Sequence, residues 1–230
     1  EVSVLKKEKD SDRTLEGAIF GLFAKEDIKS ETTGKVLIEA DEIIELKSTD
    51  EEGKITFVAD LPIGATYYVK ELYAPDGFVT NDEVKEFTFE YAGEEQPTVT
   101  YDFTFENQPT VVEFTKSSLT TGKELPGCKL KVVDADGNIV DEWTSGKEAH
   151  VIRELTVGKE YTLVETKPAD GYVTAESVKS TIKDTADVQK VEMKDDVTKV
   201  KISKQDIAGK ELPGAKLTIL DQDGKVVESW

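Results

Sequence analysis

Lysine side chains at matching places in three strand-like segments are the first candidates for chemistry. The segments are Val2–Lys6, Val112–Lys116 and Val200–Lys204. Each alternates apolar and polar residues, as a half-buried β-strand does, and in each the last position on the apolar face is a lysine. Because an unpaired charge inside a protein is costly, a lysine directed toward a core needs a partner or a chemical role.

Carboxyl and amide side chains occupy the same kind of face in two further motifs. The middle motif, YYVKELYAPDGFV and its match YTLVETKPADGYV, places Glu71 and Glu165 in register with apolar residues. The closing motif, FTFENQP and its match KVEMKDD, does the same for Asn107 and Asp195. The sequence therefore directs one Lys, one Glu and one Asn or Asp toward a core, twice over.

Burial would make such a trio reactive. Loss of solvation lowers the pKa of a lysine, so its amine can be neutral and nucleophilic. The same loss raises the pKa of a carboxyl group, and a protonated glutamate can donate to the side-chain carbonyl of Asn or Asp and shuttle protons. Held in contact, the groups would form an amide, with loss of ammonia from Asn107 or of water from Asp195. The residue types also allow a noncovalent cluster of buried salt bridges.

Ordinary roles account for most single residues of these kinds. A lysine at a strand end usually extends its ammonium into water, and Glu or Asn before a turn is usually solvated. Three such residues in the apolar register of three strands, repeated, favour a shared role. Lys7 would be the inward lysine after a shift of one residue, but the strand register favours Lys6.

An internal repeat explains why the trio recurs. The stretch VEFTKSSLTTGKELPG matches VKISKQDIAGKELPG and, without gaps, the opening VSVLKKEKDSDRTLEG. Boundaries near residues 109 and 198 give units at 1–109, 110–198 and 199–230. The third has opening strands but neither later motif, so we expect it to be the amino-terminal part of an incomplete unit and the chain to be a segment of a longer protein.

Within each unit, short alternating runs separated by turn signals predict an all-β fold. Turns such as Asp136-Gly137 and Val157-Gly158 fit a small antiparallel sandwich. The first unit is longer than the second over residues 38–61. We expect an extra hairpin or a short helical turn near Ala24–Ile28.

Charge and composition exclude several function classes. The 230 residues carry 48 acidic and 29 basic side chains, a net charge of −19, which disfavours nucleic acid and anionic lipid as partners. The sequence contains no apolar run of membrane-spanning length, and residues 1–30 show no signal or transit pattern.

Metal and thiol chemistry have little support in the sequence. His150 is the only histidine, so a His-rich metal site is not possible, and DADGN is better explained as a hairpin turn than as a calcium loop. Cys128 takes the place of Ala18 and Ala215, which indicates a small buried residue rather than a nucleophile. We expect no cofactor, no metal and no intrachain disulfide.

The opening, middle and closing motifs together resemble Cna B-type, SpaA-pilin-like domains of Gram-positive surface proteins. The resemblance implies tandem transthyretin-like (prealbumin-like, Ig-like) β-sandwiches, each forming an autocatalytic isopeptide bond between its first and last strands. By position it implies the following roles: Lys6 joined to Asn107 with Glu71 as catalyst, Lys116 joined to Asp195 with Glu165 as catalyst, and Lys204 as nucleophile of the third unit.

The resemblance also implies a function. The chain would be a structural stalk segment of an extracellular, cell-wall-anchored adhesin or pilin, with neighbouring domains of the same protein as its partners. Tension would pass through each cross-link and bypass the sandwich between its ends. The alternative is an adhesin module that recognises a host protein or glycan through the first domain. Catalysis on external substrates is not expected, because the cross-link would consume the reactive groups.

Overall fold

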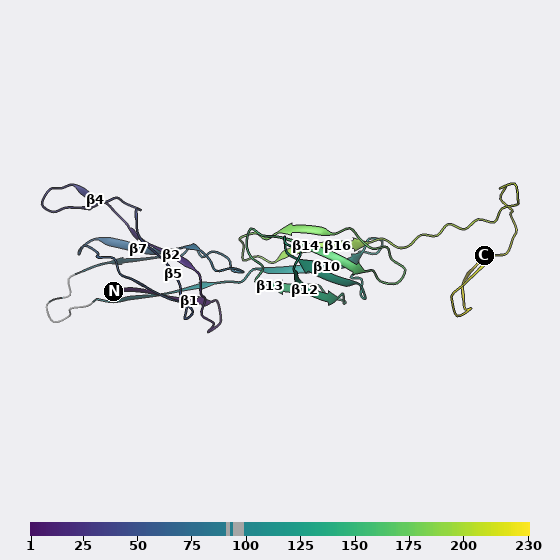
Figure 1. Ribbon diagram of the computed structural model, residues 1–230, viewed down its shortest axis with the longest axis horizontal. Coiled ribbons are helices and arrows are strands. Elements are labelled where there is room, and N and C mark those ends of the chain that lie inside the picture. Colours follow the sequence, from purple (N-terminus) through teal and green to yellow (C-terminus); the bar gives the residue numbers. More distant parts are fainter. Residues whose placement is uncertain (91–92, 94–98) are drawn as a thin grey trace. The chain divides into compact units, whose positions relative to one another are not determined.

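The computed structural model describes residues 1–90, 93 and 99–230, and within these residues every regular element is a β-strand (Figure 1). The predicted all-β class is therefore confirmed. The chain divides into one unit at Glu1–Asp196 and a second at Val197–Trp230. The first unit holds two sandwiches, which we call domain 1 (strands β1 to β9) and domain 2 (strands β10 to β16).

Domain 1 has two facing sheets around an aromatic and aliphatic core. One has the order β6-β1-β9, with strands Lys54–Phe57, Val2–Glu8 and Tyr101–Asn107. The other has the order β5-β2-β7-β8, with strands Ile43–Ser48, Ile19–Ala24, Thr66–Tyr73 and Val84–Thr88. Burial alternates along β1, where Val2, Val4 and Lys6 face inward, as the period of two in the sequence predicts.

An extra hairpin extends domain 1. Strands β3 (Ile28–Lys29) and β4 (Val36–Ile38) pair antiparallel, and β4 lies away from the two sheets in Figure 1. Residues 24–28 contain no helical turn. Of the two structures expected for the longer first unit, the hairpin forms.

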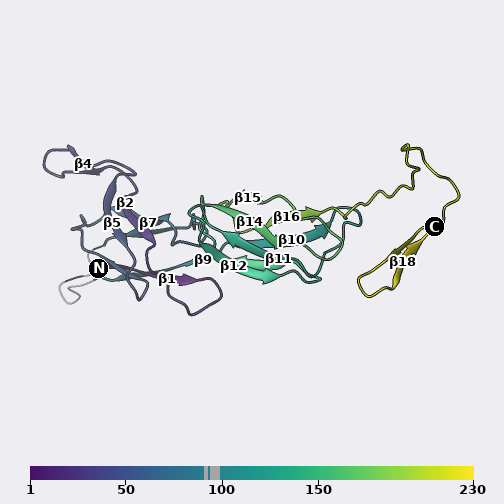
Figure 2. The same ribbon diagram turned by 45° about the vertical axis from the view of Figure 1, so that its right-hand side comes forward.

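Domain 2 repeats the arrangement without that hairpin. One sheet has the order β13-β10-β16, with strands His150–Arg153, Val111–Ser118 and Gln189–Asp195. The other has the order β12-β11-β14-β15, with strands Ile139–Thr144, Lys129–Val133, Glu160–Lys167 and Val178–Thr181. Figure 2 shows the labelled strands β10, β11, β14 and β16 from a second direction.

The first and last strands of each domain run parallel. In domain 1, β1 pairs with β9 and places Lys6 opposite Phe105; in domain 2, β10 pairs with β16 and places Lys116 opposite Met193. The expectation of a wholly antiparallel sandwich is therefore wrong for these two pairs. A parallel pair needs a long crossover connection, and here the rest of each domain supplies it.

Contacts on both sides of a short connection join domain 1 to domain 2. The Arg13 guanidinium donates to both carboxylate oxygens of Glu154, at 2.6 and 3.2 Å. Thr110 is buried, and its hydroxyl contacts the carbonyl oxygens of Leu155 at 2.6 Å and of Gly77 at 3.3 Å. The connection is thus fixed by side chains and does not depend on the backbone alone.

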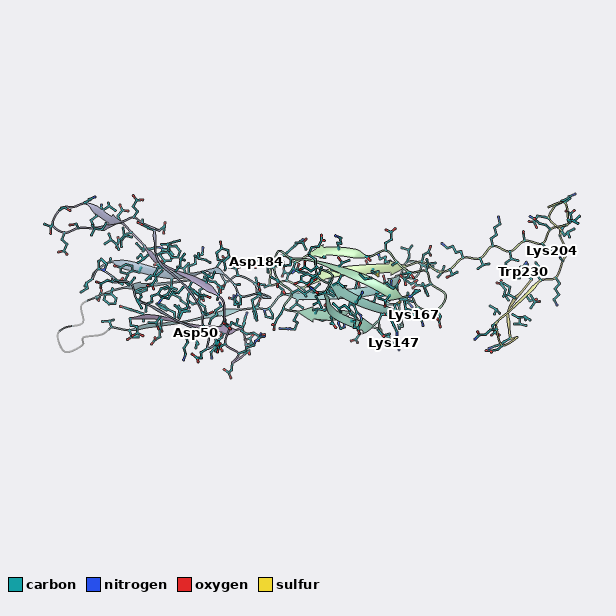
Figure 3. The ribbon with its side chains drawn as sticks, in the orientation of Figure 1. Asp50, Lys147, Lys167, Asp184, Lys204 and Trp230 are labelled. Carbon is teal, nitrogen blue, oxygen red and sulfur yellow. The ribbon has the colours of Figure 1, made fainter. Side chains whose placement is uncertain are left out.

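The unit at Val197–Trp230 contains one hairpin, β17 (Thr218–Leu220) with β18 (Val226–Ser229). The strand expected at Val200–Lys204 does not form, and both labelled residues of this unit in Figure 3, Lys204 and Trp230, are exposed. In domains 1 and 2 the equivalent strand lies between two partners, and residues 197–230 provide no counterpart of either. The described residues include no helix with the length and apolarity that crossing a membrane requires.

Candidate cross-linking sites

Domain 1 brings Lys6, Glu71 and Asn107 together in its core. They come from β1, β7 and β9, so two lie on one sheet and Glu71 faces them from the other. Their exposed fractions are 0%, 0% and 2%. The Lys6 Nζ atom also lies 5.5 Å from the ring centroid of Phe20 and 5.9 Å from that of Phe105, so the amine is surrounded by apolar groups.

Hydrogen bonds connect all three side chains. Lys6 Nζ donates to Asn107 Oδ1 and lies 3.0 Å from Glu71 Oε1. Asn107 Nδ2 donates to the same Glu71 oxygen at 3.0 Å. The backbone N–H of Asn81 donates to Glu71 Oε2 at 2.7 Å. Glu71 is thus held by its second oxygen while its first contacts both the amine and the amide nitrogen.

Burial lowers the pKa of Lys6, and the nearby Glu71 opposes that shift. The amine is thereby moved toward its neutral, nucleophilic form. Glu71 contacts the nitrogen of Asn107 and not its carbonyl oxygen, which differs from the expected hydrogen bond to the carbonyl. The geometry suits a base that accepts a proton from the amine and passes it to the departing nitrogen.

Domain 2 gathers the equivalent trio. Lys116 is 1% exposed and Asp195 0%, and the side chain of Glu165 is fully covered. Lys116 Nζ donates to Asp195 Oδ1 and lies 3.2 Å from Glu165 Oε1. Burial raises the pKa of Asp195, Lys116 opposes the shift, and Glu165 adds to it. A protonated Asp195 is the form from which water can leave as an amide is made.

The other two candidate lysines are not in such a trio. The side chain of Lys7 is 28% exposed and lies 3.6 Å from Asp12, so the inward lysine of β1 is Lys6. Lys204 is exposed, and the described residues of its unit do not bring a glutamate and an Asn or Asp acceptor beside it in a buried trio. Its role as a nucleophile remains a prediction.

A family model for the SpaA prealbumin-like fold domain matches residues 1–105 and 110–197. These two matches correspond to the two sandwiches and include the strands that carry the lysines and glutamates. The chain belongs to the SpaA prealbumin-like domain family.

Three solved structures illustrate what this chain is similar to. The Bacillus anthracis TIE protein is 25% identical with a TM-score of 0.51, over 99% of this chain and 40% of its own. A mutant of the shaft pilin SpaA of Lactobacillus rhamnosus GG is 16% identical with a TM-score of 0.38, over 86% of this chain and 98% of its own. A streptococcal ancillary pilin is 25% identical with a TM-score of 0.34, over 84% and 61%. The chain thus spans two fifths of the TIE protein. No curated protein matches it.

The sequence did not predict the backbone amides that bind the glutamates of both SpaA domains. The N–H of Asn81 binds Glu71 Oε2, and the N–H of Ala175 binds Glu165 Oε2 at 2.8 Å. Every residue except proline supplies a backbone N–H, so residue type carries almost no signal for this contact. The equal spacing of ten residues after each glutamate is the signal that was available.

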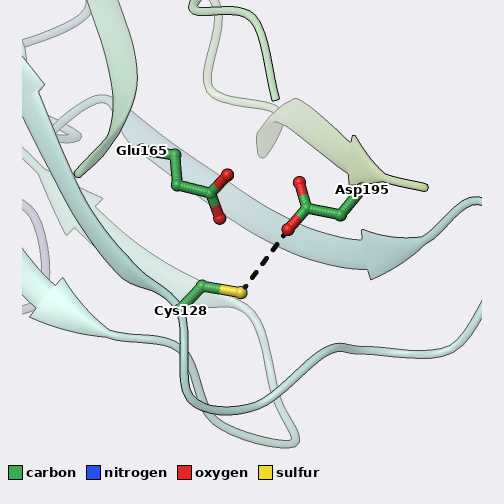
Figure 4. A group of neighbouring side chains, drawn as sticks. All are labelled: Cys128, Glu165 and Asp195. Carbon is green, nitrogen blue, oxygen red and sulfur yellow. Dashed lines mark hydrogen bonds between the residues drawn. The ribbon is translucent and has the colours of Figure 1, made fainter. Parts of the chain in front are cut away.

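A cysteine adjoins the trio of the second SpaA domain. Cys128, Glu165 and Asp195 are buried, and their ligand atoms all lie within 4.8 Å of one another (Figure 4). Such a set is also compatible with a metal ion. Here the Lys116 amine contacts both carboxyl groups and supplies the positive charge that balances them.

Proposed function

We propose that this chain is a stalk segment of a Gram-positive cell-surface adhesin or pilin whose SpaA domains cross-link themselves. The observation that carries the proposal is the buried trio of Lys, Glu and Asn or Asp, repeated at matching positions of two domains. Membership of the SpaA family supports an extracellular, structural role. Its partners are neighbouring domains of the same protein.

In domain 1 the proposed reaction joins Lys6 to Asn107. Neutral Lys6 Nζ attacks Cγ of Asn107, and Glu71 accepts a proton from the attacking nitrogen. Glu71 Oε1 lies 3.0 Å from Nδ2 and returns that proton to it. The Cγ–Nδ2 bond breaks, ammonia leaves, and a Lys–Asn amide remains. Contact between the groups before reaction supplies much of the rate.

In domain 2 the same steps join Lys116 to Asp195, and the leaving group is water. Two protons pass from the amine to the departing oxygen in total: one makes the Lys116 amine and the Asp195 carboxyl neutral before attack, and Glu165 carries the second after attack, so that the oxygen leaves as water. Each reaction occurs once per domain and leaves the glutamate unchanged. The chain is therefore not an enzyme that turns over an external substrate.

The intact mass of the purified chain tests the proposal. Both bonds together predict a mass below that of the sequence by one ammonia and one water, with each loss located on the peptides that carry the joined residues. A noncovalent salt-bridge cluster predicts the full mass. That result would refute self-cross-linking.

A pair of variants tests the role of Glu71. Glu71→Ala should restore the ammonia in domain 1 while domain 2 still loses water, because each trio is complete within its own domain. Glu86→Ala, which removes a half-exposed glutamate of β8, serves as the control and should leave both losses intact. If the bond of domain 1 forms without Glu71, the assigned catalyst is wrong.

A further inference from the structure

We propose that Cys128 is a positioning residue for the cross-link of domain 2, holding the carboxyl of Asp195 so that one defined oxygen faces Lys116 and the other leaves. This inference rests on the proposed function. It assigns a role to a thiol that the sequence presents only as a small buried residue.

The contact is direct and fully buried. Cys128 Sγ lies 3.8 Å from Asp195 Oδ2 and equally far from the carbonyl oxygen of Leu125, so its one S–H can donate to either, while Lys116 Nζ donates to Asp195 Oδ1 (Figure 4 shows the contact with Asp195). Cys128 and Asp195 are both 0% exposed, so water does not compete for these oxygens. The two oxygens of the acceptor are therefore distinguished by their donors.

The matching place in domain 1 shows why a donor is needed. Cys128 corresponds to Ala18, since both make the same backbone contact with a buried hydroxyl. The N–H of Cys128 donates to Ser145 at 2.9 Å, and the N–H of Ala18 donates to Thr49 at 3.0 Å. In domain 1 the acceptor is an amide, and its own N–H satisfies Glu71 Oε1.

An aspartate has no such N–H. In domain 2 the equivalent oxygen, Glu165 Oε1, is buried and receives no hydrogen bond within the described part of the chain. Two carboxyl groups thus face each other, and the carboxyl of Asp195 could present either of its oxygens to the amine. The thiol supplies a donor at Oδ2 of Asp195, the oxygen that the amine does not contact.

The thiol acts as a hydrogen-bond donor and not as a nucleophile. Burial raises the pKa of Cys128, so the sulfur keeps its proton. Lys116 Nζ attacks Cγ of Asp195, and the proton that it then loses passes by way of Glu165 to Oδ2. The Cγ–Oδ2 bond breaks and water leaves, while the S–H bond is unchanged. A donor on Oδ2 assists that departure and keeps Oδ1 as the carbonyl of the new amide.

The rate of water loss tests the inference. The full chain is made by cell-free synthesis with a short pulse of label, quenched into denaturant at intervals, and digested for mass analysis. Cys128→Ala should slow water loss about fivefold, the value of one weak hydrogen bond in the transition state. Cys128→Ser should restore most of the rate, because the serine hydroxyl still donates a hydrogen bond, although serine fits the site less well than cysteine. Ammonia loss in domain 1 of the same molecules is the internal clock and should not change.

A gain-of-function pair covers the case in which the alanine variant folds poorly. Asn107→Asp in domain 1 creates an aspartate acceptor beside Ala18, and adding Ala18→Cys should accelerate its water loss. If Cys128→Ala reacts at the parent rate, or Ala18→Cys gives no acceleration, the positioning role is wrong and the proposed function stands. If the parent chain never loses water, the proposed cross-link of domain 2 itself fails.

Discussion

Removing both charged members of the domain 1 trio would isolate what the proposed cross-link contributes to stability. The double variant Lys6→Met with Glu71→Gln lacks the nucleophile and the base, so no amide with Asn107 can form. Replacing the pair together avoids leaving a buried charge without its partner, which would add a large cost of its own. A methionine at position 6 still packs against Phe20 and Phe105, which surround the amine now.

The expected loss follows from the length of the closed loop. Lys6 and Asn107 are 101 residues apart in sequence. Cross-linking a loop of that length lowers the entropy of the unfolded chain and stabilises the fold by about 4.7 kcal/mol. For a domain of this size the melting temperature should fall by about 20–35 °C.

Scanning calorimetry of the parent chain and the double variant measures the effect. Domain 2 keeps its own proposed cross-link, over 79 residues, and serves as the reference transition in both samples. Intact mass shows in each sample which bonds are present. If the parent has lost ammonia but the domain 1 melting temperatures of the parent and the double variant differ by only a few degrees, the loop-closure reasoning is refuted.

Three further predictions concern the pKa of Lys6, a glycine beside Lys6, and the connection between the two domains. Burial lowers the pKa of Lys6 below its usual 10.5, so between the folded-state pKa and 10.5 the unfolded chain binds more protons than the folded chain does. In Asn107→Leu, where Lys6 stays free, the free energy of unfolding from urea titrations should therefore rise as pH rises toward 10.5, and a flat profile would contradict this. Gly53→Ala should destabilise domain 1 by more than about 1 kcal/mol in thermal melts. The reason is that its Cβ would lie 2.6 Å from the Lys6 carbonyl oxygen at a φ of +72°, and Gly64→Ala, with no atom within 4 Å, is the matched control. Thr110→Val should cost about 1–3 kcal/mol by denaturant titration, because a buried hydroxyl that contacts two backbone carbonyls is lost; an unchanged midpoint would contradict this.

The positions of the trio could be predicted because two independent patterns agree on them. A period of two places Lys6, Glu71 and Asn107 on inward faces, and the repeat places Lys116, Glu165 and Asp195 on the same faces again. Each pattern alone is weak, since a strand-end lysine is usually solvated. The structure brings both sets into contact, in agreement with the sequence.

Strand direction could not be predicted in the same way. Alternation of apolar and polar residues is identical in parallel and antiparallel strands, so β1 and β9 gave no sign of running the same way. The strand expected at Val200–Lys204 failed for a related reason. Alternation marks a segment that can be a strand, but a strand forms only against partners, and Val197–Trp230 provides none for it.

The contacts of Cys128 could not be predicted from the repeat. Alignment with Ala18 and Ala215 marks the position as small and buried, which is correct, and hides the one property that differs, a polar S–H. Its neighbour Asp195 lies 67 residues away in sequence, beyond the reach of local pattern. Substitutions that break a repeat next to a reactive group are therefore informative.

The parallel pairing of first and last strands has a consequence for how a protein of this kind can grow. Because β1 and β9 run in the same direction, the chain enters domain 1 at one end of the sandwich and leaves at the opposite end. The same holds for β10 and β16 in domain 2. A copied domain can therefore follow its predecessor directly, with no return segment and no redesign of either sheet. Duplication of one coding unit is then enough to lengthen the protein by one domain.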